Sequence, residues 1–367
     1  MRAGQTSNVL KEVPHPAPKP VEDGRLSTPY GATLSRKREK GSNPYYSGPV
    51  SDHFDGLRFF PPGGPRDKSL ADLWRMLHSP QRRVRWPRNL PAARPDHPPE
   101  RVQGRALRVS FIGHSSFLIQ TEGVNLLLDP VWAERAGPFG VFGPKRATPP
   151  GMALHDLPPL DAILVSHNHY DHLDVATLSR LARLRPCRIL TPLGNDALLR
   201  RADPELDARA FDWGDSVAVG ALSVHFEPAL HWSARGRGDR RMALWASFVI
   251  EGAGGRIYCA GDTGYGDGSL FRDLRRKHGP IRLAILPIGA YAPRWFMRDQ
   301  HCDPEEAVRI FQHLEAEQAF ACHWGTFRLS EEPFQEPVEK LAAALAREAI
   351  DPARFLAGPS GSVMQMA

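Results

Sequence analysis

The segment that most constrains the fold is residues 166–172 (SHNHYDH), which directly follow a short apolar run. The segment places three imidazoles and one carboxylate within six residues, a density that core packing does not require. Neutral imidazoles and carboxylates are ligands of Zn²⁺, at roughly 2.0–2.2 Å. Alternate residues of an extended segment point the same way. We therefore expect His167 and His169 to share one metal, and Asp171 and His172 to reach a second.

One loop cannot complete two metal sites, so further ligands must come from the ends of other strands. Three ligand-type residues stand in small-residue turns after apolar strands: His231 after 222–227, Asp262 after 256–259 and His323 after 319–322. Turns at strand ends are where site residues gather in α/β folds. The same ligand types also bind Fe and Mn, so they do not identify the metal.

From residue 107 onward, short apolar runs alternate with helical patterns. Strands are predicted at 107–111, 117–120, 125–129, 162–166, 188–191, 216–219, 222–227, 244–251, 256–259, 283–287 and 319–322. Helices are predicted at 175–184, 194–201, 269–277, 303–315 and 334–347, the fourth with Asp303 as N-cap and Pro304 at its first position. A meander followed by strand–helix alternation predicts an α/β sandwich of two mixed sheets covered by helices.

The N-terminal part of the chain differs in composition. Residues 1–108 hold 20 Lys and Arg against 10 Asp and Glu, whereas residues 109–367 hold 27 against 31, for a formal net charge of +6. Of the 35 prolines, 16 precede residue 101. We therefore divide the chain into a disordered, basic, proline-rich arm (1–42), an extension (43–106) and a domain that carries the metal motifs (107–367).

The extension contains one helical pattern at residues 69–78. Ser69 is the expected N-cap, and Leu70, Leu73, Trp74 and Leu77 have the spacing of an amphipathic helix. Four arginines follow, at positions 82, 83, 85 and 88. Two interpretations stay open: a helix that packs on the main domain beside solvated arginines, or an element that binds a membrane surface or a partner.

The sequence also favours a cytoplasmic location. Neither a secretory signal nor an apolar run of about 18 residues is present. The four cysteines, Cys187, Cys259, Cys302 and Cys322, form no CxxC pair. A reducing compartment is the expectation, with peripheral contact at the inner face of a membrane through the basic N-terminal segment as the accompanying hypothesis.

The motifs resemble the metallo-β-lactamase superfamily, and within it the branch of N-acyl phosphatidylethanolamine phospholipase D. The resemblance rests on segments between residues 107 and 355: 113–116 (GHSS), 128–130 (LDP), 143–146 (GPKR), 166–174 (SHNHYDHLD), 261–265 (GDTGY), 286–291 (LPIGAY), 293–297 (PRWFM), 300–301 (QH), 303–307 (DPEEA) and 323–327 (HWGTF). The fold it implies is an αββα sandwich.

The resemblance also implies a two-zinc site, with Mn or Fe as alternatives. The implied ligands are His167, His169 and His231 for the first zinc, Asp171, His172 and His323 for the second, and Asp262 between them. A hydroxide between the metals is the implied nucleophile, which Asp171 also orients. His301 is implied to contact the phosphate or assist the leaving group, the alternative being a packing histidine. We expect His114 and Asp129 to orient ligand imidazoles.

The resemblance thus suggests a zinc phosphodiesterase that converts N-acyl phosphatidylethanolamine to N-acylethanolamine and phosphatidic acid. The alternative keeps the site and changes the substrate to a soluble lactone or a cyclic or nucleotide phosphodiester. A nucleic-acid partner is not expected, because no aromatic-basic RNA signature is present. A non-catalytic membrane-associated protein is disfavoured because the ligand set is intact. Homodimerisation stays open.

Overall fold

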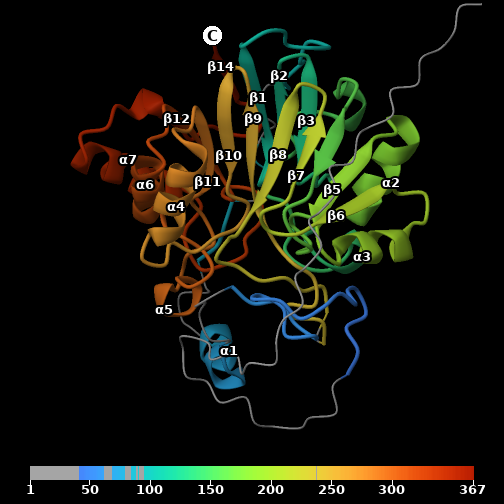
Figure 1. The fold of residues 1–367 in the computed structure, drawn as a ribbon. Helices are drawn as coiled ribbons and strands as arrows, with labels where there is room; N and C mark the ends of the chain where they lie inside the picture. Colours follow the sequence, from blue (N-terminus) through green and yellow to red (C-terminus); the bar gives the residue numbers. More distant parts are fainter. Residues whose placement is uncertain (1–40, 62–67, 79–83, 88–89, 91–94, 237) are drawn as a thin grey trace, which may run out of the picture. The chain divides into compact units, whose positions relative to one another are not determined.

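Two seven-stranded mixed sheets form the centre of this computed structural model (Figure 1). The structure describes residues 41–61, 68–78, 84–87, 90, 95–236 and 238–367. These belong to one unit, residues 41–367, described here by itself. The predicted arm, residues 1–42, lies outside the described residues except for positions 41 and 42.

The first sheet has the strand order β14-β1-β2-β3-β4-β5-β6. Its strands are β1 (Leu107–Gly113), β2 (Ser116–Thr121), β3 (Val124–Leu128), β4 (Ala162–Leu164), β5 (Arg188–Pro192), β6 (Ala208–Phe211) and β14 (Val363–Met366). Antiparallel pairing joins β14, β1, β2 and β3, and parallel pairing joins β3 to β6. The sheet is therefore mixed, as predicted.

The second sheet has the order β13-β12-β11-β10-β9-β8-β7. Its strands are β7 (Ser216–Val219), β8 (Leu222–Glu227), β9 (Ser247–Gly252), β10 (Gly255–Cys259), β11 (Leu283–Pro287), β12 (Gln318–Cys322) and β13 (Phe355–Leu356). Strands β8, β10, β11 and β12 run in one direction, since β9 is antiparallel to both β8 and β10. The last residues of these four strands therefore meet at one edge of the sheet.

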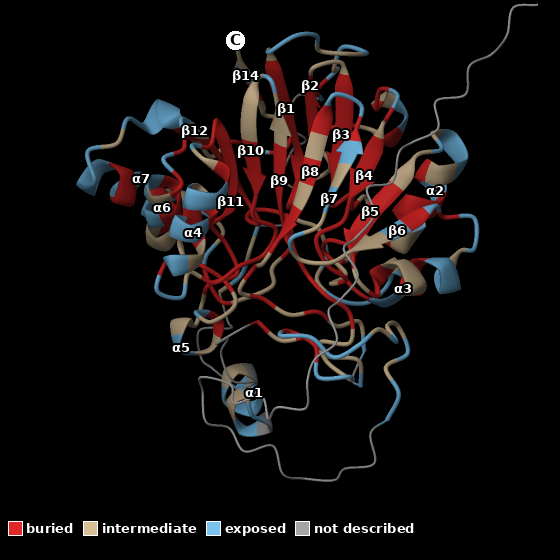
Figure 2. Cartoon of the chain, viewed as in Figure 1, coloured by how far each residue is buried: buried red, intermediate tan, exposed pale blue. Residues whose placement is uncertain are grey.

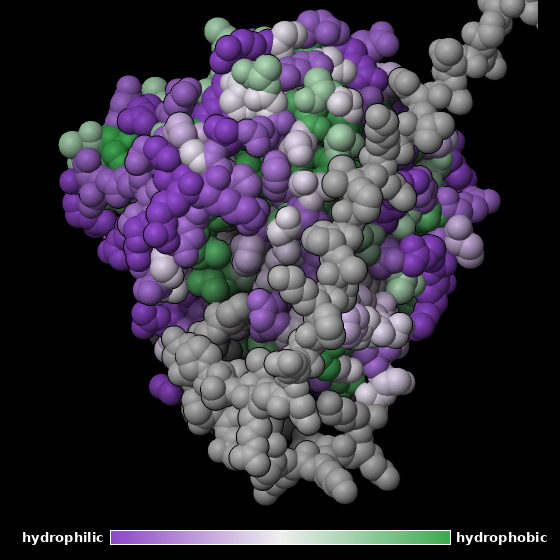
Figure 3. Space-filling model, viewed as in Figure 1, coloured by the Kyte–Doolittle hydropathy of each residue, from purple (hydrophilic) through white to green (hydrophobic). Residues whose placement is uncertain are grey.

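Helices cover the outer faces of the two sheets and complete the predicted α/β sandwich (Figure 1). They are α2 (Val175–Leu184) and α3 (Asn195–Ala202) on the first sheet, and α4 (Ser269–His278), α6 (Pro304–His313) and α7 (Glu336–Arg347) on the second. Single 3₁₀ turns are η2 (Pro138–Gly140), η3 (Leu154–Asp156) and η4 (Pro352–Arg354). The outer surfaces of α4 and α6 are mostly hydrophilic (Figure 3).

Successive side chains of a strand point to opposite faces of its sheet, so each apolar strand contributes side chains to two cores. Leu126 and Leu128 of β3 face the core between the sheets, whereas Leu127 packs under the helices of the first sheet. In β9, Phe248 faces the inner core and Val249 the helices of the second sheet. The strands are consequently buried on both faces (Figure 2). This explains why they appear in the sequence as continuous apolar runs.

Most predicted elements are present, with shifts at their ends. Helix α2 has the predicted bounds, and α6 begins at Pro304 with Asp303 as its N-cap. Strand β9 begins at Ser247 rather than at 244, and β4 ends at Leu164 rather than at 166. The prediction missed β6, β13, β14 and the short helix α5 (Arg294–Met297). These are short elements at sheet edges or in loops, whose partners lie far away in sequence.

The predicted helix of the extension is confirmed as α1 (Leu70–Leu77). The Ser69 side chain caps it, and Asp72 closes a capping box. Lys68 pairs with Asp299 at 2.6 Å, and the Arg75 guanidinium lies 4.6 Å from the centre of the Trp295 ring. Helix α1 thus contacts the main domain. Arg82, Arg83 and Arg88 lie outside the described residues.

The start of the extension is also anchored to the main domain. Phe54 and Phe59 are buried in one apolar cluster with Leu244 and Trp245. His53 lies nearby between the carboxylates of Asp52 and Asp212, at 2.6 and 2.8 Å. Among the described helices, none is both long and apolar enough to cross a membrane.

Candidate metal centre

The predicted ligand residues converge at one end of the two sheets. The loop after β4 supplies residues 167–172, and the loops after β8, β10 and β12 supply His231, Asp262 and His323. His114 lies in the β1–β2 turn and Asp129 directly after β3. Parallel strands present their carboxyl ends at the same edge, which is why Asp171 and His323, 152 positions apart in the chain, meet here.

Three groups of side chains have ligand atoms close enough together to hold a metal ion. They are His167, His169, His231 and Asp262; His114, Asp171, His172 and His323; and Asp262, His301 and His323. Within each group the ligand atoms lie within 4.8 Å of one another. All seven residues expected as metal ligands therefore occur in these groups, together with His114 and His301.

Asp262 occupies the position between the first two groups. Its Oδ2 lies 3.1 Å from His323 Nε2 and 3.3 Å from His172 Nε2. The same oxygen lies 3.6 Å from His231 Nε2 and 3.8 Å from His167 Nε2. One carboxylate thus faces imidazoles of both groups, as a ligand shared by two metals must.

The backbone fixes the orientation of His231 in the first group. Its Nδ1 donates a hydrogen bond to the Gln300 carbonyl at 2.9 Å, which leaves the Nε2 lone pair facing the other ligands. His231 Nε2 lies 3.2 Å from His169 Nδ1, and His167 Nε2 lies 2.9 Å from that same nitrogen. Three imidazole nitrogens therefore point at a common position.

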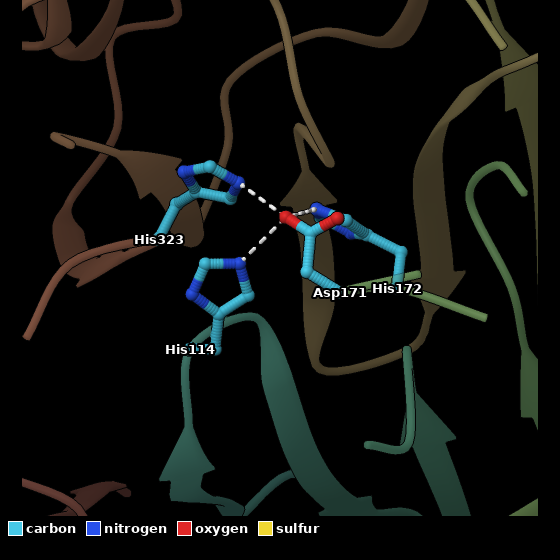
Figure 4. Close-up of side chains that lie close together, drawn as sticks. All are labelled: His114, Asp171, His172 and His323. Atoms are coloured by element: carbon cyan, nitrogen blue, oxygen red, sulfur yellow. Dashed lines mark hydrogen bonds and ion pairs between the residues drawn. The ribbon is translucent and has the colours of Figure 1, made fainter. Parts of the chain in front are cut away.

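The second group surrounds the Asp171 carboxylate (Figure 4). Asp171 Oδ2 lies 3.0 Å from His114 Nε2, 3.2 Å from His323 Nε2 and 3.6 Å from His172 Nε2. Behind His172, Asp129 Oδ2 accepts a hydrogen bond from Nδ1 at 2.7 Å. The structure thus places Asp129 where it orients an imidazole.

The partner of His114 differs from the expectation. We expected His114 to orient an imidazole, but its Nε2 contacts the Asp171 carboxylate and places it within the second group. The turn residue has a left-handed backbone, with φ of 58°. That conformation aims the ring into the site rather than along the strand. Sequence reasoning missed this because turn geometry decides the direction of the side chain.

Burial and neighbouring charges set the protonation of the site. Burial lowers the pKa of His167 well below its usual value, that of His169 to about 4 and that of His231 to about 3, so the first group carries neutral imidazoles. Burial alone would raise the pKa of Asp262. The nearby His172 and His323 outweigh it, so the pKa of Asp262 falls well below its ordinary range. The carboxylate is therefore ionised.

The donor set fits a pair of divalent metal ions. Three buried ligand-type atoms that belong to these groups have no hydrogen-bond partner among the described residues: Asp262 Oδ1, His172 Nε2 and His301 Nδ1. A buried polar atom left without a partner costs about 1–3 kcal/mol. Metal coordination would offset that cost, and nitrogen with carboxylate oxygen suits Zn, Fe or Mn.

A cavity of about 360 Å³ opens over these groups. His169, Asp171, Asp262, His301 and His323 line its floor. Its walls combine apolar and basic residues: Leu73, Met76, Phe296, Met297, Leu329, Lys68 and Arg240. Phe296 and Met297 of the 293–297 motif line the cavity, whereas Trp295 does not line it and lies under the Arg75 guanidinium.

Replacing Asp129 tests whether its hydrogen bond with His172 supports metal binding. Asp129→Asn is expected to weaken metal retention by about 10–100-fold, as the loss of an oriented ligand partner does elsewhere. The reason is that the variant removes the charge that holds the proton on His172 Nδ1. Metal content after dialysis against a graded chelator measures the effect.

Asp174→Asn is the matched control, on the loop after β4 that also carries His172. Asp174 caps α2 through the Thr177 backbone N–H and also accepts from the Ala133 N–H, and it contacts no candidate ligand. Asparagine caps helices about as well as aspartate. Metal retention should therefore be unchanged in Asp174→Asn, and equal loss in both variants would contradict the role of Asp129.

The sequence is similar to those of known proteins. A family model for the beta-lactamase superfamily domain matches residues 124–324. An uncharacterised protein of Mycobacterium tuberculosis is 42% identical over 258 residues, covering 69% of this chain and 68% of that protein. A Caenorhabditis elegans protein named N-acyl-phosphatidylethanolamine-hydrolyzing phospholipase D 1 is 37% identical over 270 residues, covering 71% and 76%.

Solved structures also resemble the fold. A diiron β-hydroxylase from Streptomyces venezuelae superposes with a TM-score of 0.52 at 19% identity, covering 73% of this chain and 54% of that chain. At this identity the likeness concerns the fold alone.

Proposed function

This chain belongs to the metallo-β-lactamase superfamily and is a metal-dependent hydrolase, and on that premise we propose that it hydrolyses the phosphodiester bond of N-acyl phosphatidylethanolamine. The products would be N-acylethanolamine and phosphatidic acid. The observation that carries the proposal is the cavity, which joins a floor of candidate metal ligands to an apolar wall with two basic residues. The name of the nematode relative supports the choice of substrate.

We propose two metal ions, held by His167, His169 and His231 on one side and by Asp171, His172 and His323 on the other, with Asp262 between them. Such a pair supplies water of lowered pKa and stabilises negative charge on phosphoryl oxygens. Zinc is the proposed metal. Iron and manganese are the alternatives, because imidazole and carboxylate ligands bind them as well.

The chain's own residues then have distinct roles. Asp171 lies on the cavity floor and would accept a hydrogen bond from the attacking water, which fixes its direction. His301 lines the same floor, with its Nδ1 3.9 Å from Asp262 Oδ2. From there it would hydrogen-bond the phosphate or pass a proton to the leaving oxygen. Arg294 positions His301 by donating a hydrogen bond to its carbonyl at 2.8 Å.

The volume of the cavity is also compatible with a second candidate function. About 360 Å³ accommodates a headgroup but not two acyl chains, which would have to extend outside. A soluble lactone or a cyclic or nucleotide phosphodiester would also fit. With the lipid as substrate, we propose that the enzyme is cytoplasmic and in peripheral contact with the inner face of a membrane.

The experiment compares two substrates with the metal-loaded chain. N-acyl phosphatidylethanolamine in detergent micelles should be turned over with kcat/KM at least about tenfold above that for bis(p-nitrophenyl) phosphate, because apolar walls favour the lipid by at least about 1.4 kcal/mol. Release of N-acylethanolamine is measured by mass spectrometry. Turnover of the soluble diester alone would contradict the lipid assignment and favour the second candidate.

A further inference from the structure

A loop between β3 and β4 exposes large apolar side chains. In this tip loop, residues 137–143 (GPFGVFG), Phe139 is 93% exposed, Val141 64% and Phe142 63%. Three adjacent exposed apolar side chains form a patch, which single scattered ones do not. Leaving two phenylalanines in water is unfavourable, so the patch points to a surface that covers it.

The tip loop is held in one conformation by its neck. Ala136 N–H donates to the Pro144 carbonyl at 3.1 Å, and Arg135 donates to the Gly143 carbonyl at 2.9 Å. A Cβ on Gly137 would lie 2.2 Å from the Phe142 oxygen, and one on Gly143 would lie 2.1 Å from the Ala136 oxygen. The two glycines therefore allow the two sides of the neck to approach each other this closely.

Phe139 has a strained backbone at the end of this loop. Its φ of 58° and ψ of 13° lie in the left-handed region, which a bulky residue rarely adopts. Strain of this kind persists where the surrounding structure imposes it, and it is concentrated at functional positions. Here it turns the most exposed phenylalanine outward.

The neck of the tip loop is connected by packing to the lining of the cavity. Ala136, at its neck, belongs to a small apolar cluster with Val131 and Phe327, against which Leu329 packs. Leu329 also lines the cavity over the metal ligands. Helix α1 reaches the same cavity through Leu73 and Met76, and its Trp74 is 64% exposed. Two elements that are connected to the cavity lining, the tip loop and α1, therefore carry exposed apolar residues.

We propose that the tip loop inserts Phe139, Val141 and Phe142 into the interface of a lipid bilayer and so holds the mouth of the cavity against the membrane. The proposal rests on the lipid substrate proposed above and names the element that brings the enzyme to it. Arg135 and Lys145 flank the loop; since Lys145 pairs with Glu134 at 2.9 Å, Arg135 supplies the net positive charge that favours anionic lipid. The basic N-terminal segment need not supply this contact.

A second copy of the chain is a poorer occupant. Stable interfaces bury about 800 Å² on each partner. An aromatic side chain buries about 150–250 Å², so this patch supplies roughly 500 Å². A bilayer needs no complementary surface and accepts an isolated apolar tip of this size.

The test uses the full, metal-loaded chain and sedimentation with phosphatidylcholine vesicles, with and without phosphatidylglycerol. A double variant carries Phe139→Asn, since asparagine tolerates the left-handed conformation, and Phe142→Ser. Its partition onto vesicles is expected to be at least about tenfold weaker than that of the unaltered chain. Leu184→Ser, which changes another exposed apolar residue at the end of α2, is the matched control and should bind like the unaltered chain.

Two further measurements complete the test. Phe139→Trp should show blue-shifted emission and quenching by brominated acyl chains when vesicles are added. Hydrolysis of N-acyl phosphatidylethanolamine in vesicles should fall with binding in the double variant, while hydrolysis of bis(p-nitrophenyl) phosphate stays unchanged.

Several outcomes would overturn the inference: unchanged vesicle binding in the double variant, no vesicle binding by the unaltered chain, or a change only in oligomeric state by light scattering. The lipid substrate can fail separately. If vesicle binding is lost in the double variant but no form of the chain cleaves the lipid, the tip loop stands as a membrane contact and the proposed substrate does not.

Discussion

Asp262→Asn is expected to reduce turnover by more than about 100-fold and to deplete the bound metal. Loss of a residue that merely orients a ligand costs about 10–100-fold, so loss of a shared ligand must cost more. The carboxylate oxygen of Asp262 lies within 3.8 Å of four imidazole nitrogens from both groups. The variant would leave those imidazoles without their common negative charge. Elemental analysis and the phosphodiesterase assay measure the two effects.

Glu227→Gln separates this effect from a general loss of stability. Glu227 is buried and accepts hydrogen bonds from Lys277 and His278 at 2.7 and 2.9 Å, yet it belongs to none of the candidate metal groups. Its variant should melt at a lower temperature and keep its metal content. An active, metal-loaded Asp262→Asn protein would refute the shared-ligand role.

Removing the metal is expected to abolish activity and to destabilise the domain. Ligand-type atoms that are buried without partners would lose their coordination. A metal present at about 1,000 times its Kd contributes about 4 kcal/mol, so at roughly 2–4 °C per kcal/mol the loss of each ion lowers the Tm by about 10 °C. Differential scanning fluorimetry with and without a chelator measures the shift.

Reconstitution identifies the metal after chelation. Zn²⁺, Mn²⁺ and Fe²⁺ are added back separately, and the ion that restores both Tm and turnover at two equivalents per chain is the one the site selects. Restoration by a single equivalent would contradict a two-metal site. A Tm that does not respond to the chelator would show that these residues do not hold a metal as proposed.

Much of the fold was predictable because its signals are local. Capping residues determined where helices begin, as at Ser69 and Asp303. Apolar runs predicted the central strands, because a strand buried on both faces leaves a continuous apolar run. The short edge strands β6 and β14 were not predictable, since each depends on a partner elsewhere in the chain.

The candidate site, like the fold, was predictable from the sequence only in part. By itself, the sequence determined which residue types follow which strands, and so named His167, His169, Asp171 and His172 together with their distant partners. Only the tertiary structure decided that His114 turns onto Asp171 and that Phe139 points into solvent. The reason is physical: ligand type is a property of a residue, whereas the direction of a side chain depends on backbone angles and on neighbours brought together by folding.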